Sequence, residues 1–324
     1  MQTKSQVQEL LLSAGVSPNR KLGQHFLVDL NLMRLLLDSA QIGRGDVVLE
    51  VGAGTGSLTE ALVERAGQVV TVELDGTLAA IAQSRLANAE NVQIVNADIL
   101  SGKGTINPAV AQAVTQAQTR LGQPGPIGPM SPTGPMPTGE SVPAAPPSRP
   151  GRLLLVSNLP YDVASPVMIN LVKGPVTADA MFVTVQREVA QRMTAPPGGR
   201  EYGTLSIFLQ ATGAVETLRV LKPSVFWPPP QVDSAIVRYI RDERKSRRIQ
   251  DMELFGTVVA LFIGHRRKML RACLKQAPAE LGGRDLWLAL FEQHSIDPTC
   301  RPEELSPDQY VDLANSCHQS IKTQ

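Results

Sequence analysis

The sequence predicts an α/β protein with a mostly parallel sheet, helices on both faces of that sheet, and a small all-α domain at the carboxyl end. Three observations lead to this prediction. From residue 46 onward, β-branched runs alternate with helix-forming stretches; a glycine-rich turn follows the first run; and the strand pattern stops near residue 245. Alternation of this kind is typical of right-handed βαβ units on a parallel sheet.

Length and charge limit the domain organisation and the partners. The chain has 324 residues, 43% of them hydrophobic, which is enough for one large core and a smaller one, so we expect domains at 1–244 and 245–324. The net charge is only +1, so a nucleic-acid site would have to come from local clustering of basic residues.

The expected elements follow from the pattern of apolar residues. Strands are expected in the first domain, the last two as an antiparallel hairpin at the sheet edge: 47–51, 69–74, 92–98, 152–158, 178–186, 214–221 and 234–240. Helices are expected between the early strands and throughout the second domain: 58–67, 77–87, 252–277, 284–294 and 306–319. Pro307 suits the first position of the last helix.

A Pro/Gly-rich insertion interrupts the α/β pattern at about 101–150. Its part 122–150 holds ten prolines, five glycines and no aromatic residue, a composition that cannot bury enough apolar surface to fold. We therefore expect a disordered spacer within the first domain. The alternative, a proline-rich ligand for an adaptor domain, lacks a recognisable core motif.

Cysteine content and hydropathy indicate the compartment. Cys273, Cys300 and Cys317 are few, widely spaced and odd in number, which fits reduced thiols better than disulfides or a metal site. The stretch 7–16 is too short for a signal-peptide core and carries a glutamate, and no apolar run of about 20 residues occurs. We expect a cytoplasmic protein without a membrane partner, and a monomer.

The glycine-rich turn predicts a nucleotide-like ligand. Gly52, Gly54 and Gly56 lie between a strand and a helix, where the backbone can turn sharply and approach a ligand closely. The dinucleotide fingerprint requires glycine at the sixth position, which is Ser57 here, so a nicotinamide cofactor is disfavoured.

Two acidic residues lie at the carboxyl ends of the next two predicted strands. Glu73 follows the turn by about 20 residues and could accept hydrogen bonds from both ribose hydroxyls, while Asp98 could accept from an adenine amino group. Either acid alone could be a helix cap. Open α/β sheets bind ligands at strand carboxyl ends, so three such features in series favour a binding site.

Several motifs, in this order, closely resemble the KsgA/RsmA family of rRNA adenine dimethyltransferases: "GQHFL", "EVGAGTGSLT", "NLPYDVASP", "YGTLSI" and "FWPPPQVDSAIVR". The resemblance covers nearly the whole chain except 101–150. It implies a Rossmann-like methyltransferase sheet, S-adenosylmethionine as methyl donor, and adenosines near the 3′ end of 16S rRNA in a small-subunit precursor particle as acceptors, dimethylated during ribosome biogenesis. The family's cofactor positions map onto His25, Leu27, Gly52, Glu73, Asp98 and Asn158.

The "NLPY" motif, 158–161, is interpreted as a clamp for an adenine base. An exocyclic adenine amine is a poor nucleophile because its lone pair is delocalised into the ring. The Asn158 side-chain carbonyl and the Leu159 backbone carbonyl could accept the two amine hydrogens, and Pro160 stiffens the turn. The Tyr161 ring could stack on the flipped base, with Phe226 on the opposite face as the resemblance implies. Read alone, Phe226 would simply pack under the proline loop.

This chemistry needs no general base before transfer, because the amine becomes acidic only once it carries the new methyl group. Catalysis would rest on proximity and alignment. The family usually has asparagine and serine or threonine where this chain has Asp162 and Ala164, so the positioning of the substrate, but not the reaction class, is in question.

Basic residues cluster near the domain boundary. The interval 238–275 has eleven Lys or Arg against four Asp or Glu. Its segment 264–270, "GHRRKML", resembles a basic helix of the family with Met269 in place of threonine. Such a run is often a solvated face, but beside a base-flipping pocket it predicts RNA contacts.

Three alternatives remain. A large-subunit rRNA adenine methyltransferase of the antibiotic-resistance type shares the fold, but the basic segment and the full motif set argue against it. A non-catalytic ribosome-assembly or transcription factor could keep this fold, although intact Gly52, Glu73, Asp98 and Asn158 favour activity. A dehydrogenase is disfavoured by the glycine spacing.

Overall fold

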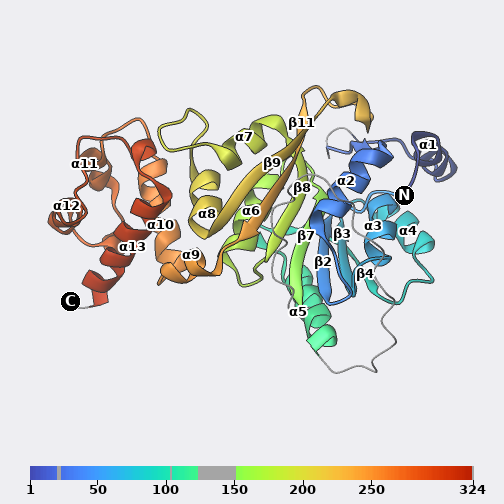
Figure 1. Cartoon of the computed structure of the whole chain (residues 1–324), viewed down its shortest axis with the longest axis horizontal. Helices are drawn as coiled ribbons and strands as arrows, with labels where there is room; N and C mark the ends of the chain where they lie inside the picture. Colours follow the sequence, from blue (N-terminus) through green and yellow to red (C-terminus); the bar gives the residue numbers. More distant parts are fainter. Residues whose placement is uncertain (20–22, 103, 123–150, 323–324) are drawn as a thin grey trace, which may run out of the picture.

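A seven-stranded sheet forms the centre of the protein (Figure 1). The computed structural model describes residues 1–19, 23–102, 104–122 and 151–322. Within the sheet β11 runs in the opposite direction to the other six strands. The order from edge to edge is β4 (Val92–Asn96), β3 (Gln68–Glu73), β2 (Asp46–Val51), β7 (Arg152–Asn158), β8 (Ala180–Gln186), β11 (Ser234–Arg241) and β9 (Gly213–Leu221). The predicted parallel sheet and its antiparallel edge hairpin are confirmed.

Helices cover both faces of the sheet, and two further pairs of short strands lie outside it. The pairs are β1 (Phe26–Leu27) with β10 (Phe226–Trp227), and β5 (Leu100–Ser101) with β6 (Thr105–Ile106). The helices of the first 241 residues are α1 (Lys4–Ser13), α2 (Leu30–Ala40), α3 (Ser57–Val63), α4 (Gly76–Arg85), α5 (Pro108–Gly122), α6 (Ala164–Lys173), α7 (Arg187–Thr194) and α8 (Thr204–Thr212).

Strand alternation divides the apolar residues of the sheet between two cores. Val47 and Leu49 point into one core with α5 and α6, while Val48 between them points into the other with α2 and α3. All six residues of β2 are buried. A central parallel strand that is apolar on both faces is expected of such a layered fold.

The chain beyond β11 is helical and packs on α8 (Figure 1). Phe255 meets Phe208 of α8 edge to face at 5.1 Å, so one apolar core continues from the sheet into this region. Its helices are α9 (Glu243–Arg248), α10 (Met252–Ile263), α11 (Leu270–Cys273), α12 (Arg284–Gln293) and α13 (Pro307–Lys322), with single 3₁₀ turns at Leu274–Gln276, Ala279–Leu281 and Pro302–Glu304. Across the described ranges, no helix is both long and apolar enough to cross a membrane.

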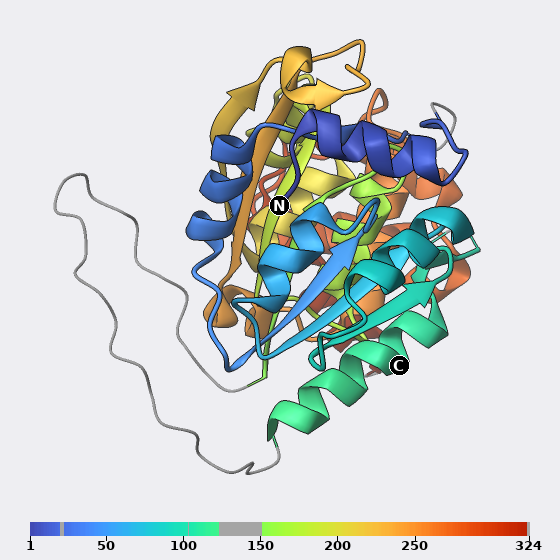
Figure 2. The same ribbon diagram turned by 90° about the vertical axis from the view of Figure 1, so that its right-hand side faces the viewer.

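Two expectations about local structure are wrong. The predicted disordered insertion 101–150 contains α5, which lies beside β2 and β3 and buries Val110, Ala113, Val114 and Ala117 on one face (Figure 2). That spacing is an amphipathic helix. Residues 123–150 lie outside the described residues, so the spacer prediction is untested there.

The predicted helix 252–277 is also interrupted. α10 ends at Ile263, and residues 264–269 form turns before α11 begins. The backbone N–H groups of Leu270 and Arg271 donate to the carbonyls of Cys300 and Pro298, at 2.9 and 3.0 Å. These bonds to a loop thirty residues away replace the bonds of a continuous helix, so "GHRRKML" is a loop and not a basic helix.

A buried ion pair joins the beginnings of β2 and β7. Asp46 and Arg152 are opposite each other in the ladder, and the guanidinium donates to both carboxylate oxygens at 2.9 and 2.6 Å. Both side chains are buried. We expect Asp46→Asn to lower the free energy of unfolding by about 3–5 kcal/mol in urea titration, because it leaves a buried cation without its counter-charge.

Asp38→Asn is the matched control, because its pair with Arg65 at 3.7 Å is exposed. This change should cost less than about 1 kcal/mol. Equal losses in the two variants would show that burial does not strengthen the Asp46 pair.

Candidate active site

The carboxyl ends of four neighbouring strands surround a cavity of about 220 Å³. Its walls come from the loop before β1, the glycine turn after β2, the ends of β3 and β4, and the turn after β7. All six candidate cofactor residues line it: His25, Leu27, Gly52, Glu73, Asp98 and Asn158. The structure therefore brings together residues that are 133 positions apart in the sequence.

The glycine turn has a backbone that other residues would strain. Gly52, Gly54 and Gly56 have φ values of +87°, +55° and +79°. A Cβ on Gly54 would also lie 2.9 Å from a ring carbon of Phe26. The turn therefore needs glycine both for its conformation and for the close approach of β1.

Glu73 connects the glycine turn to the turn after β3. One carboxylate oxygen accepts the Gly54 N–H at 2.8 Å and the other accepts the Asp75 N–H at 2.9 Å. Burial raises the pKa of the Glu73 carboxyl, and these two donors oppose that rise. Each oxygen keeps a lone pair for a further donor in the cavity.

Asp98 is exposed at the rim, and its Oδ1 accepts the Leu100 N–H at 2.9 Å. Neither acid caps a helix, because the N-cap of α4 is Asp75 and Leu100 begins β5, so both Glu73 and Asp98 hold turns beside the cavity. Asp162 also lines this cavity, whereas Ala164 is buried at the beginning of α6.

Asn158 presents an acceptor without a partner. Its Nδ2 donates to the backbone carbonyl of His25 at 2.8 Å, which fixes the orientation of the amide. Its Oδ1 is buried and has no hydrogen-bond partner among the described residues. A buried acceptor left unpaired carries a desolvation cost that a ligand donor would remove.

The other residues of "NLPY" hold this turn in place. The Leu159 side chain is buried in the core, and Pro160 lines the cavity beside Gly52. The Tyr161 hydroxyl hydrogen-bonds Ser234 Oγ at 2.8 Å, and its ring stacks on His25 with centroids 5.6 Å apart. His25 Nδ1 is in turn 2.7 Å from the Pro228 carbonyl oxygen. These contacts fix the Tyr161 ring against His25, which lines the cavity, whereas Leu159 and Tyr161 themselves are not among the lining residues.

Phe226 is not at the cavity. Its side chain is only 3% exposed and packs in the core with Leu27, which it faces across the β1–β10 pair. Trp227, the next residue, points to the other side and stacks on Phe26. Strand alternation directs this side chain into the core, and the expected role of Phe226 as the second face of a base sandwich stays a prediction.

A family model described as ribosomal RNA adenine dimethylase matches residues 15–319. The chain belongs to the ribosomal RNA adenine dimethylase family. A protein named ribosomal RNA small subunit methyltransferase A from Pelotomaculum thermopropionicum is 34% identical over 312 residues, which cover 96% of this chain and 95% of that protein. A relative of the same name from Bacillus mycoides is 30% identical over 318 residues, or 97% of this chain and 96% of the relative.

Two solved structures share the fold of this chain. A dimethyladenosine transferase from Plasmodium falciparum superposes with a TM-score of 0.64 at 20% identity, over 89% of this chain and 96% of that one. The 23S rRNA methyltransferase ErmE has a TM-score of 0.53 at 22% identity, over 91% of this chain and all of that one. At these identities the likeness concerns the fold alone.

In this member of the adenine dimethylase family, the basic residues near 264–270 have two different surroundings. Arg266 donates to the Glu303 carboxylate at 2.7 Å and to the Arg200 carbonyl at 3.0 Å, so it ties the loop to neighbouring segments. Arg267 and Lys268 are exposed. The local positive excess therefore includes cations with a structural role.

Glu50 is a residue of the site that sequence reasoning missed. It lines the cavity, is 1% exposed, and one of its oxygens accepts the hydroxyls of Thr59 and Thr71, each at 2.7 Å. Burial raises the pKa of the Glu50 carboxyl to about 8, and the nearby Glu73 adds to the rise. The available signal was a carboxylate in the otherwise apolar strand "VVLEV".

This pKa predicts a pH-dependent stability. Between about pH 4.5, where an unfolded glutamate ionises, and about pH 8, the folded state binds more protons than the unfolded state. The stabilising contribution of Glu50 is therefore complete below this range and is lost as the pH rises through it. We expect the Tm of the unliganded protein to fall between about pH 5 and pH 8, and to fall less in Glu50→Gln.

Thermal unfolding of both proteins at the two pH values measures the difference. The glutamine carbonyl can still accept both threonine hydroxyls, so the variant isolates the titration. The same fall in Tm in both proteins would contradict the raised pKa.

Proposed function

We propose that the protein transfers methyl groups from S-adenosylmethionine to the exocyclic amine of adenosines near the 3′ end of 16S small-subunit rRNA. The observation that carries this proposal is the unpartnered Asn158 Oδ1 beside the cavity, held in position by the bond from Nδ2 to His25. Asn158 lines the cavity, and its unpaired acceptor would take a hydrogen of the adenine amine once the base is bound. Membership in the adenine dimethylase family supports the same substrate class.

The cavity suits the proposed cofactor through its own residues. Glu73 would accept the ribose hydroxyls, Asp98 the adenine amino group, and the Gly52 turn would let the chain approach closely. The cofactor supplies a methyl group on a positively charged sulfur. Once the methyl group is transferred, the sulfur is a neutral thioether. A ligand that carries positive charge would favour the ionised forms of the two buried acids at the site, Glu50 and Glu73, which burial alone disfavours.

The acceptor base would be aligned by the "NLPY" turn. Oδ1 of Asn158 and the carbonyl oxygen of Leu159 accept the amine hydrogens, which favours a pyramidal nitrogen with its lone pair directed along the reaction axis. Tyr161, whose hydroxyl is hydrogen-bonded to Ser234, would stack its ring on the base. Phe226 would have to leave its core position to cover the opposite face of the base.

Proton transfer follows methyl transfer and needs no side-chain base. The product nitrogen is positively charged until it loses a proton, which water can take. Repetition on the same nitrogen would give dimethyladenosine, since the first methyl group leaves one hydrogen for Asn158 or Leu159 to accept. Alignment therefore provides the catalysis.

Purified protein with labelled S-adenosylmethionine tests the function. Small-subunit particles lacking the modification should gain label on adenosine N6, and naked large-subunit rRNA should not. Label only on the large-subunit rRNA would identify the resistance-type activity instead. No transfer to either, with the cofactor bound, would favour a non-catalytic assembly factor.

The helical region, residues 245–324, is proposed to contact rRNA in the precursor particle, with the protein acting as a monomer. Arg267 and Lys268 support this proposal, because both are exposed on the loop between α10 and α11. Arg266 is excluded as a free phosphate contact by its bond to Glu303.

Changing Arg267 and Lys268 together to alanine should weaken binding to the ribosomal particle and flatten its salt dependence. Each lost phosphate contact removes roughly 0.7–0.9 from the slope of log K against log salt. Filter binding over a salt series measures this slope. Arg34→Ala with Arg65→Ala removes equal charge from α2 and from the turn after α3, and should leave the slope unchanged. Equal effects would mean that only total charge matters.

A further inference from the structure

Helix α1 closes the side of the cavity that the sheet leaves open. Figure 2 shows α1, in dark blue, beside the strand ends that carry the site. Val7 of α1 lines the cavity and packs with Leu11 and with Leu78 of α4. None of the expected cofactor residues lies this early in the chain, so this wall is an addition to the site.

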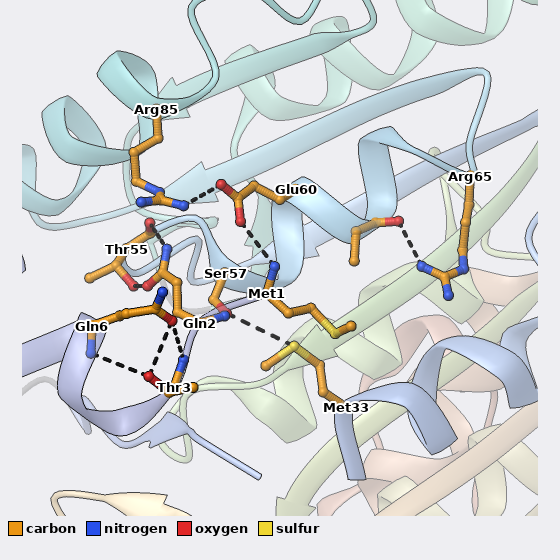
Figure 3. A network of polar contacts seen from close by, with 11 residues as sticks. Met1, Gln2, Thr3, Gln6, Met33, Thr55, Ser57, Glu60, Arg65 and Arg85 are labelled. Atoms are coloured by element: carbon orange, nitrogen blue, oxygen red, sulfur yellow. Dashed lines mark hydrogen bonds and ion pairs between the residues drawn. The ribbon is translucent and has the colours of Figure 1, made fainter. Parts of the chain in front are cut away.

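Gln2, just before α1, is bonded to the glycine turn (Figure 3). Its Nε2 donates to the Thr55 carbonyl at 3.1 Å, and its Oε1 accepts the Thr55 hydroxyl at 2.6 Å. Its backbone N–H donates to Ser57 Oγ at 2.7 Å. Gln2 is 2% exposed and Thr55 is 1% exposed, so these bonds are made away from water.

We propose that Gln2 is a positioning residue for the cofactor: it fixes the glycine turn, and with α1 it forms the closing wall of the cofactor cavity. The bonds form a connected path. Gln2 holds Thr55; the adjacent Gly54 donates its N–H to Glu73; and Glu73 faces the cavity. Loss of the Gln2 hydrogen bonds would therefore shift Glu73, the group expected to bind the ribose.

The attachment of α1 suggests how a ligand enters. Its buried contacts are few: among the described residues, the apolar cluster that holds it has Val7, Leu11 and Leu78 as fully buried members, and its other members are partly buried, namely Val16, Phe26, Ile81 and Trp227. Small clusters and exposed backbone belong to the parts of a protein that open most readily. Movement of α1 would therefore open the cavity while both main cores stay intact, and a bound nucleoside cofactor would hold α1 closed.

Gln2→Met tests this proposal, which rests on the proposed function. Methionine keeps the volume of glutamine but forms neither bond to Thr55, so a packing role would tolerate it. We expect the Kd for S-adenosylhomocysteine, measured by calorimetry, to rise about tenfold for the two lost hydrogen bonds. The KM for S-adenosylmethionine should rise similarly, while kcat at saturating cofactor and the KM for the ribosomal particle stay within about twofold.

Gln8→Met is the matched control, because Gln8 is on the exposed face of α1 and should leave the Kd unchanged. Hydrogen exchange of the amides in 4–13 gives a second measurement, in which S-adenosylhomocysteine should slow exchange in the unaltered protein. An unchanged Kd in Gln2→Met, or exchange that the ligand does not slow, overturns the inference alone. Failure of the unaltered protein to bind the ligand would overturn the proposed function as well.

Discussion

Strand β2 is hydrogen-bonded in parallel to β3 on one side and to β7 on the other, and this arrangement determines where the site is. Parallel neighbours bring their carboxyl ends to the same edge. The glycine turn leaves β2 there, Glu73 ends β3, and Asn158 ends β7. The Asp46–Arg152 pair at the opposite edge sets the register of β2 against β7, so a change in this register would separate the turn from the asparagine.

Two buried carboxyl groups at the site, with neutral hydrogen-bond donors, suit a positively charged methyl donor. Glu50 and Glu73 are both buried, and the pKa of each carboxyl is raised by burial. Their hydrogen-bond donors are neutral hydroxyl and backbone N–H groups, so these contacts bring no positive charge. A cationic cofactor would favour the ionised form of each carboxyl and so oppose the rise in its pKa, and the cavity would bind the charged donor more tightly than the neutral thioether product.

Site residues that follow strand ends could be predicted from the sequence. Features that depend on contacts with distant parts of the chain could not. Gly52, Glu73 and Asn158 follow recognisable strands, so their convergence could be expected before the structure was seen. The orientation of Phe226 depends on a two-residue strand pair with β1, and the loop at 264–269 depends on carbonyls near residue 300; neither is encoded locally. The apolar face of α5 contains alanines, which give a weak hydrophobic signal beside the proline-rich stretch.

The proposed role of Asn158 is tested most directly by single-turnover methyl transfer with Asn158→Ala, at concentrations where calorimetry and filter binding show both substrates to be saturating. Because the lost carbonyl acts on the amine at the moment of transfer, we expect the rate to fall about 10²–10³-fold, as when one preorganised hydrogen-bonding group is removed from a transition state. Transfer at the parental rate would contradict the account and make "NLPY" a structural turn.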